Sequence, residues 1–151
     1  MERLLRKKLP HGKFVGVSKE RSERMRAVKG RGNRTTEIRL RSALVRFRLR
    51  GWRIASKEIP GRPDFYFPKR RLAVFVDGCF WHGCRRCGHY PKTNSKFWRA
   101  KIERNRVRDR KTAEVLQGLG VKVIRFWEHE LRDELARCVE RIELAFRRRK
   151  G

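Results

Sequence analysis

Residues 78–91 constrain the fold of this chain more than any other part of its sequence. The segment is rich in Cys, Gly and His and shows neither the helical nor the strand period of apolar residues. A cross-link other than a backbone hydrogen-bond ladder therefore has to hold it. It contains Cys79, Cys84 and Cys87, while Cys138 stands alone. In a reducing compartment this spacing favours a metal site over disulfides.

The three clustered cysteines need one further nitrogen or sulfur ligand to form a closed, tetrahedral zinc site. His129 and His89 are both candidates. His129 is expected at the start of the last helix, directly after a strand, so it would tie the irregular segment to the body of the fold. A site closed by four protein ligands is structural, so a catalytic ion would have to bind elsewhere.

The charge of the chain indicates its partner. Among 151 residues, 43 Lys and Arg stand against 16 Asp and Glu, which gives a net charge of +27. The basic residues are spread through the whole chain, which favours nucleic acid over an anionic membrane. We find neither a membrane-length apolar stretch nor the apolar core of a signal peptide. We therefore expect a cytoplasmic, nucleoid-associated protein without a membrane partner.

The periodicity of apolar residues predicts one α/β domain, a sandwich with a mixed sheet flanked by helices. The expected elements are helices over residues 35–51, 95–117 and 129–146 and strands over residues 52–55, 64–67, 72–76 and 121–127. The positions expected to face the core on the helices are Leu40, Ala43, Leu44, Phe47, Phe97, Trp98, Ile102, Ala113, Leu116, Leu131, Leu135, Cys138, Ile142 and Phe146. Ser95 is a possible cap of the long helix.

The two ends of the chain look different from this domain. Residues 1 to about 33 mix basic residues with Gly, Ser and Pro and show no sustained period. We expect a flexible basic arm over residues 1–24, the folded domain over 25–147 and a basic tail over 148–151.

Two carboxylates are predicted at adjacent strand ends. Asp64 opens an apolar run after a Gly-Arg-Pro turn, and Asp77 closes the next strand of the same hairpin. They could converge on one divalent cation, and hard oxygen ligands of this kind suit Mg²⁺. The alternative for Asp64 is a turn residue that caps a backbone amide.

His82 lies among the cysteines and has two possible roles. It has the pKa range of a general base, with Asp109 on the following helix as a partner that orients it, or it could be a zinc ligand. The neighbouring aromatics Phe80 and Trp81 would either pack around the metal or wedge between DNA bases. Trp98 has the same two possibilities, and its helical position favours the core.

Several motifs together resemble the very short patch repair family of DNA mismatch endonucleases. They are Gly61-Arg62-Pro63-Asp64-Phe65, the run from Phe75 to Cys84, Pro91-Lys92-Thr93-Asn94, Phe97-Trp98, Asn105, Arg108-Asp109 and Trp127-Glu128-His129. The resemblance covers residues 25–144 and implies a restriction-endonuclease-like fold of the PD-(D/E)XK type. It also implies a monomer that nicks duplex DNA 5′ to the T of a T·G mismatch left by deamination of 5-methylcytosine, with possible contacts to mismatch-repair proteins.

The resemblance also implies roles for individual residues. Asp64 and the carbonyl of Val76 would bind catalytic Mg²⁺, and His82 would be the general base with Asp109 as its partner. The other implied positions are Glu37 in the active site, Cys79, Cys84, Cys87 and His129 on structural zinc, and Met25, Phe80, Trp81, Trp98, Lys92 and Asn105 on DNA.

The chain departs from the family pattern at two positions. Asp77 stands where the best-described member has a second catalytic His, which removes a proton donor or phosphate contact and could add a metal ligand. His129 stands where that member has Cys, and both residue types bind zinc. The departure at Asp77 motivates one alternative, a zinc-stapled DNA-binding protein without catalysis. A restriction-type nuclease acting on matched DNA is the other, by fold analogy.

Overall fold

The structure of the protein is a computed structural model that describes residues 16–27, 34–88 and 90–148. Its elements are α2 (Lys19–Ala27), α3 (Arg34–Arg46), β1 (Arg53–Ile54), β2 (Phe65–Phe67), the 3-10 turn η2 (Pro68–Arg70), β3 (Leu72–Asp77), α4 (Ser95–Gly118), β4 (Lys122–Trp127), α5 (Glu128–Asp133) and α6 (Leu135–Arg148). In the part of the chain described, no helix combines the length and apolar character that crossing a membrane requires.

The four strands form one mixed sheet in the order β1-β2-β3-β4. β1 with β2 and β2 with β3 are antiparallel, and the tight turn η2 joins the second pair as the expected hairpin. β3 and β4 are parallel, with Val74 opposite Ile124, and α4 makes the crossover between them. The predicted α/β class and mixed sheet are therefore confirmed.

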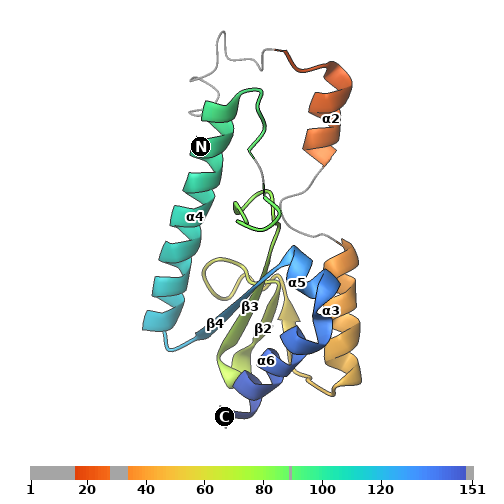
Figure 1. Ribbon diagram of the computed structural model, residues 1–151. Coiled ribbons are helices and arrows are strands. Elements are labelled where there is room, and N and C mark those ends of the chain that lie inside the picture. Colours follow the sequence, from red (N-terminus) through yellow and green to blue (C-terminus); the bar gives the residue numbers. More distant parts are fainter. Residues whose placement is uncertain (1–15, 28–33, 89, 149–151) are drawn as a thin grey trace.

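Helices cover both faces of the sheet (Figure 1). Because side chains alternate along a strand, Leu72, Val74 and Val76 of β3 point into the core beneath α3, α5 and α6. Ala73 and Phe75 point to the opposite face, where they pack with Leu116 of α4. All six residues of β3 are buried, which explains why this strand reads as a continuous apolar run that ends in Asp77.

Three boundaries differ from the predicted ones. α3 ends at Arg46 instead of residue 51, because the chain turns at Arg48, whose φ is 56°. Phe47, expected in the core, is consequently 49% exposed. The last helix is broken at Glu134, whose φ of −133° separates α5 from α6. Asn94, not Ser95, is the residue that precedes α4 as its cap.

The predicted core is otherwise confirmed for the positions that carry the helical period. Leu40, Leu44, Leu131, Cys138 and Ile142 are all buried in the larger core cluster. Trp98, Ala113, Leu135 and Phe146 are half-buried. The helix α2 was not predicted, because its sequence has no apolar face, and Figure 1 shows it separated from the sheet.

A buried and an exposed residue of α6 provide a test of this core. Ile142 is fully buried, whereas Leu144 on the same helix is 51% exposed. We expect Ile142→Ala to lower the free energy of unfolding by about 3 kcal/mol, because it leaves a cavity between the helix and the sheet. Leu144→Ala should change it by no more than about 0.5 kcal/mol. Equilibrium urea unfolding measures both values, and equal effects would contradict this packing.

Candidate active site and metal cluster

The candidate site lies at the end of the sheet where the parallel strands β3 and β4 both finish, a usual place for ligands in α/β proteins. Asp77, the last residue of β3, pairs with Trp127, the last residue of β4. The irregular segment leaves β3 at this point. α5 starts directly after β4, and its start is capped where the backbone N–H of Trp127 donates to Glu130 Oε2 at 2.7 Å.

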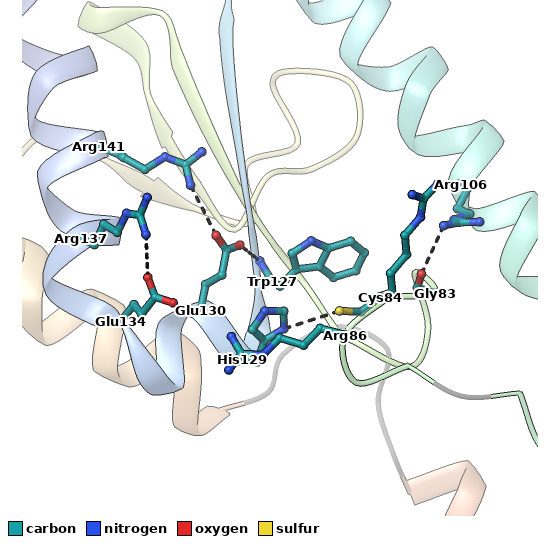
Figure 2. Close-up of a pocket in the computed structure, with 11 residues that line it drawn as sticks. Gly83, Cys84, Arg86, Arg106, Trp127, His129, Glu130, Glu134, Arg137 and Arg141 are labelled. Carbon is teal, nitrogen blue, oxygen red and sulfur yellow. Dashed lines mark hydrogen bonds and ion pairs between the residues drawn. The ribbon is translucent and has the colours of Figure 1, made fainter.

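Three cysteines from the segment after β3 meet His129 of α5. The distances from His129 Nδ1 to the Sγ atoms of Cys79, Cys84 and Cys87 are 3.3, 3.6 and 3.4 Å, and Cys84 Sγ lies 3.6 Å from Cys87 Sγ. Figure 2 shows the His129 ring directed at Cys84. The cluster could hold a metal ion, and each of the four cysteines in the chain is free of a disulfide.

Backbone geometry folds the segment around this cluster. The N–H of Cys84 donates to Cys79 O at 2.9 Å, and the N–H of Gly88 donates to Cys84 O at 2.8 Å. A Cβ atom on Gly88 would come within 2.5 Å of that Cys84 oxygen, so the close approach requires glycine. The other ligand candidate, His89, lies outside the described residues.

The protein environment acts oppositely on two of these thiols. Burial raises the pKa of the Cys79 thiol to about 12. Burial also disfavours the Cys84 thiolate, but hydrogen bonds from the backbone of Cys87, Arg86 and Gly88 outweigh it and lower its pKa. Cys138 lies elsewhere, 2% exposed in the main core, as predicted.

His82 is paired with Asp109 and stands apart from the cysteine cluster. Its Nδ1 lies 2.5 Å from Asp109 Oδ2, and the His82 residue is only 6% exposed. Burial alone would raise the pKa of Asp109, but the hydrogen bond to His82 and the charges of His82 and Arg125 lower it. Of the two roles open from the sequence, the geometry is that of a histidine oriented by a carboxylate.

The long helix α4 holds the segment that carries His82. Asn105 Nδ2 donates to the backbone oxygen of Trp81 at 2.8 Å, and Arg106 Nη2 donates to that of Gly83 at 3.2 Å. Both helix residues lie within one turn of Asp109. The same face of α4 therefore supplies the acidic partner of His82 and fixes the backbone on either side of it.

Asp64 is fixed across the hairpin by a backbone amide. The N–H of Val76 donates to Asp64 Oδ2 at 2.6 Å. The sequence alternative of an amide cap is thus correct in kind, but the amide belongs to the neighbouring strand and not to the turn of Asp64. The contact orients the half-buried carboxylate at the end of the sheet, beside the last residues of β3.

Asp77 has a partner that the sequence analysis missed. Arg125 of β4 donates to it with two nitrogens, Nε to Oδ2 at 2.7 Å and Nη2 to Oδ1 at 2.6 Å. By proximity Asp77, His82 and Asp109 could hold a metal ion, but the cation that the structure gives Asp77 is this guanidinium. One signal was available, because Arg125 is a charged residue between the apolar residues Ile124 and Phe126 of this strand.

The three aromatic candidates form one cluster. The ring centroids of Phe80 and Trp81 are 5.1 Å apart, those of Phe80 and Trp98 5.4 Å, and those of Trp81 and Trp98 6.0 Å. All three residues are half-buried, and Lys101 Nζ lies 5.0 Å from the centroid of Trp81. Trp98 also packs against the buried Phe97, in a small cluster that is separate from the core beneath α3, α5 and α6.

The remaining candidates lie away from these contacts. Glu37 is half-buried in the first turn of α3, and its carboxylate makes no hydrogen bond or ion pair within the described ranges. Met25 lies within α2, and Lys92 is exposed just before α4. The structure therefore brings Asp64, Asp77, His82 and Asp109 to one end of the sheet, but it does not join Glu37 to them by a direct contact.

Comparison with known proteins shows the family of this chain. The family model described as DNA mismatch endonuclease Vsr matches residues 15–88, which include Asp64, His82 and the three cysteines of the cluster. The DNA mismatch endonuclease Vsr of Escherichia coli (strain K12) is 40% identical over 114 residues, which cover 74% of this chain and 71% of that protein.

Two nicking enzymes are equally similar. The type II nicking enzyme V.NaeI of Lentzea aerocolonigenes is 39% identical over 128 residues, or 80% of this chain and 75% of that protein. The type II nicking enzyme V.XorIIP of Xanthomonas oryzae pv. oryzae is 41% identical over 113 residues, or 74% of this chain and 79% of that protein. With these relatives and the family match, the chain belongs to the Vsr family of DNA endonucleases.

Proposed function

We propose that this chain is a Mg²⁺-dependent, strand-specific endonuclease that nicks duplex DNA 5′ to the T of a T·G mismatch and so starts very short patch repair. The observation that carries the proposal is the 2.5 Å contact between His82 and Asp109 at the sheet end that also holds Asp64. A histidine held in this way, next to a carboxylate suited to a cation, is an arrangement for phosphodiester hydrolysis. The relative from Escherichia coli is a mismatch endonuclease by name, which supports the mismatch as the substrate.

His82 acts as the general base. The Asp109 carboxylate can only accept a hydrogen bond, so the hydrogen is on Nδ1 of His82. Nε2 of His82 is therefore left to take a proton from water. The water oxygen bonds to phosphorus, and the bond from phosphorus to the 3′ oxygen breaks. That oxygen takes up a proton from the solvent, which leaves 3′-hydroxyl and 5′-phosphate ends.

The oxygens of Asp64 and of the Val76 carbonyl fit a Mg²⁺ site. They are hard ligands, and the amide of Val76 fixes the Asp64 carboxylate at the sheet end. When bound, the cation supplies polarisation of the phosphoryl group and a more acidic water. Glu37, in the first turn of α3, adds an acidic group to the active site without a direct contact to Asp64.

On this proposal the fold belongs to the restriction-endonuclease-like PD-(D/E)XK type.

The Cys-His cluster fits zinc. Ideal tetrahedral geometry with Zn–S near 2.3 Å and Zn–N near 2.0 Å has S–S edges of about 3.8 Å and S–N edges of about 3.5 Å. The observed S–N distances of 3.3, 3.6 and 3.4 Å and the S–S distance of 3.6 Å are close to these edges. Four protein ligands close the site, so its role is to staple the segment that carries His82 to α5.

The aromatic cluster Phe80, Trp81 and Trp98 unstacks the bases beside the mismatch. Asn105 supports this contact through its hydrogen bond to the Trp81 backbone, Lys92 contacts phosphate, and Met25 wedges from the opposite groove.

The enzyme acts as a monomer on nucleoid DNA in the cytoplasm, with contacts to mismatch-repair proteins. Residues 1–24 form its basic arm, residues 25–147 the nuclease and residues 148–151 the basic tail.

Nicking of matched and mismatched duplexes tests the proposal. The purified protein with Mg²⁺ is given end-labelled duplexes that are identical except for one T·G mismatch in varied flanking contexts, beside the T·A control. We expect a single cut in the T strand of the mismatched duplex alone. Equal cutting of the T·A duplex would establish a restriction-type nuclease instead. Salt-sensitive binding without any cutting would establish a zinc-stapled DNA-binding protein.

A further inference from the structure

We infer that Arg125 is a positioning residue of this active site, which holds Asp109 and hence His82 in place by binding Asp77 and Asp109 with one guanidinium group. The inference rests on the proposed function, because it assigns Arg125 a role in nicking. It also gives Asp77 a role other than metal binding, as the anchor of Arg125.

The contacts form a continuous chain from β3 to His82. Arg125 donates hydrogen bonds to both carboxylate oxygens of Asp77, at 2.7 and 2.6 Å. This is the bidentate geometry that the planar guanidinium of arginine provides. The Nη2 atom of the same guanidinium lies 3.3 Å from Asp109 Oδ1. The other oxygen of Asp109, Oδ2, is the atom 2.5 Å from His82 Nδ1. Each oxygen of Asp109 therefore has one cationic or hydrogen-bonding partner, and together they fix its orientation.

The strand register explains why Arg125 reaches both acids. Arg125 lies opposite Phe75, two residues from the pair of Asp77 and Trp127, so its side chain shares a sheet face with Phe75 and Asp77. Its Cζ atom lies 4.7 Å from the centroid of the Phe75 ring. α4 covers this face and brings Asp109 to the guanidinium, while Asp77 itself is 8% exposed.

Electrostatics makes this contact matter for His82. Without a cation, the Asp77 and Asp109 carboxylates would repel each other, and Asp109 could relieve the repulsion by turning away from His82. The arginine is retained at a cost, because its Nη1 atom is buried with no hydrogen-bond partner in the described part of the chain. A group held at such a cost between two active-site acids is typical of a functional position.

Single-turnover nicking of the T·G duplex by the full chain tests this role, together with the dissociation constant for the same DNA. For Arg125→Gln we expect nicking to slow by about 10²-fold, with DNA affinity changed by less than about threefold, because displacement of a catalytic group impairs the chemical step. Arg125→Lys keeps the positive charge but loses the bidentate contact with Asp77, and it should slow nicking by about tenfold. Arg137→Gln is the matched control. It removes an exposed arginine of α6 that pairs with Glu134, and it should leave the rate unchanged.

A double-mutant comparison distinguishes a shared unit from independent effects. Asp77→Asn should slow nicking less than Arg125→Gln does, and the double variant should nick at the rate of Arg125→Gln alone, because the two residues act through one contact. Fold losses that multiply in the double variant, or an Arg125→Gln rate within about twofold of the wild-type rate, would overturn the inference.

The failures of the two proposals are distinguishable. If the wild-type chain does not nick the mismatched duplex, the proposed function fails. If the wild-type chain nicks and a folded Arg125→Gln variant nicks equally fast, only the role of Arg125 fails. Circular dichroism and metal content establish folding, and if Arg125→Gln does not fold, the Arg125→Lys rate decides, since an unchanged rate would refute the role.

Discussion

Replacing Asp64 with Asn should abolish nicking while leaving the fold and the binding of DNA intact. The Asn side-chain oxygen can still accept the N–H of Val76, so the contact across the hairpin survives the substitution. The negative charge that attracts a divalent cation is lost. Since a bound metal supplies several kcal/mol of transition-state stabilisation, we expect the single-turnover rate to fall by about 10³-fold.

The measurement is the nicking of the T·G duplex in saturating Mg²⁺, beside the dissociation constant for DNA. Asp133→Asn is the matched control, because this exposed carboxylate forms its ion pairs with Arg132 and Arg86. It should nick at the wild-type rate. An Asp64→Asn variant that nicks within about tenfold of the wild-type rate would show that the required cation does not depend on this carboxylate.

Removal of the cluster metal should have the second large effect. We expect Cys84→Ala to bind no zinc, to unfold the segment between β3 and α4 and to lose nicking, because His82 lies on that segment. Structural zinc in small domains contributes apparent binding energies of about 10–16 kcal/mol, comparable with the whole stability of a domain. Thermal unfolding and zinc released to a coloured chelator measure the loss.

Cys138→Ala is the control for this experiment. Cys138 is 2% exposed in the core, and burial raises the pKa of its thiol to about 11. It should lose some stability through a cavity, but it should keep its full zinc content and its nicking activity. Full zinc content and full activity in Cys84→Ala would contradict the structural role of the cluster.

The pKa of Cys138 also predicts how the thiols react. At pH 8 this thiol stays protonated in the native state and does not react. The three cluster thiols become reactive when removal of the metal unfolds their segment, because unfolding ends the burial that raises the pKa of Cys79. Because folding raises the pKa of this thiol above its unfolded value of 9.0, its contribution to the stability of the native state is full below pH 9.0. This contribution is lost as the pH rises through about 11. Removal of the metal by a chelator should therefore expose three reactive thiols, and unfolding of the whole chain should expose the fourth, Cys138.

The sequence by itself determined the elements and the composition of the cluster. Apolar residues at helical and strand spacing indicated α3, α4, β3 and β4, because a face that must be buried repeats with the period of its element. The cysteine spacing predicted a metal cluster with His129 or His89 as its fourth ligand, because a segment without a hydrogen-bond ladder needs another cross-link, and the structure brings His129 to it. Such local signals do not depend on which element lies next to which.

Only the tertiary structure decided the partners of the acidic residues. The parallel register of β3 and β4 puts Arg125 beside Asp77, and the packing of α4 brings Asp109 to the same guanidinium. These residues are 48 and 16 positions from Arg125, so no local period relates them. The end of α3 at Arg46 and the break at Glu134 were decided in the same way, because packing on the sheet overrides the helical pattern of the residues that follow.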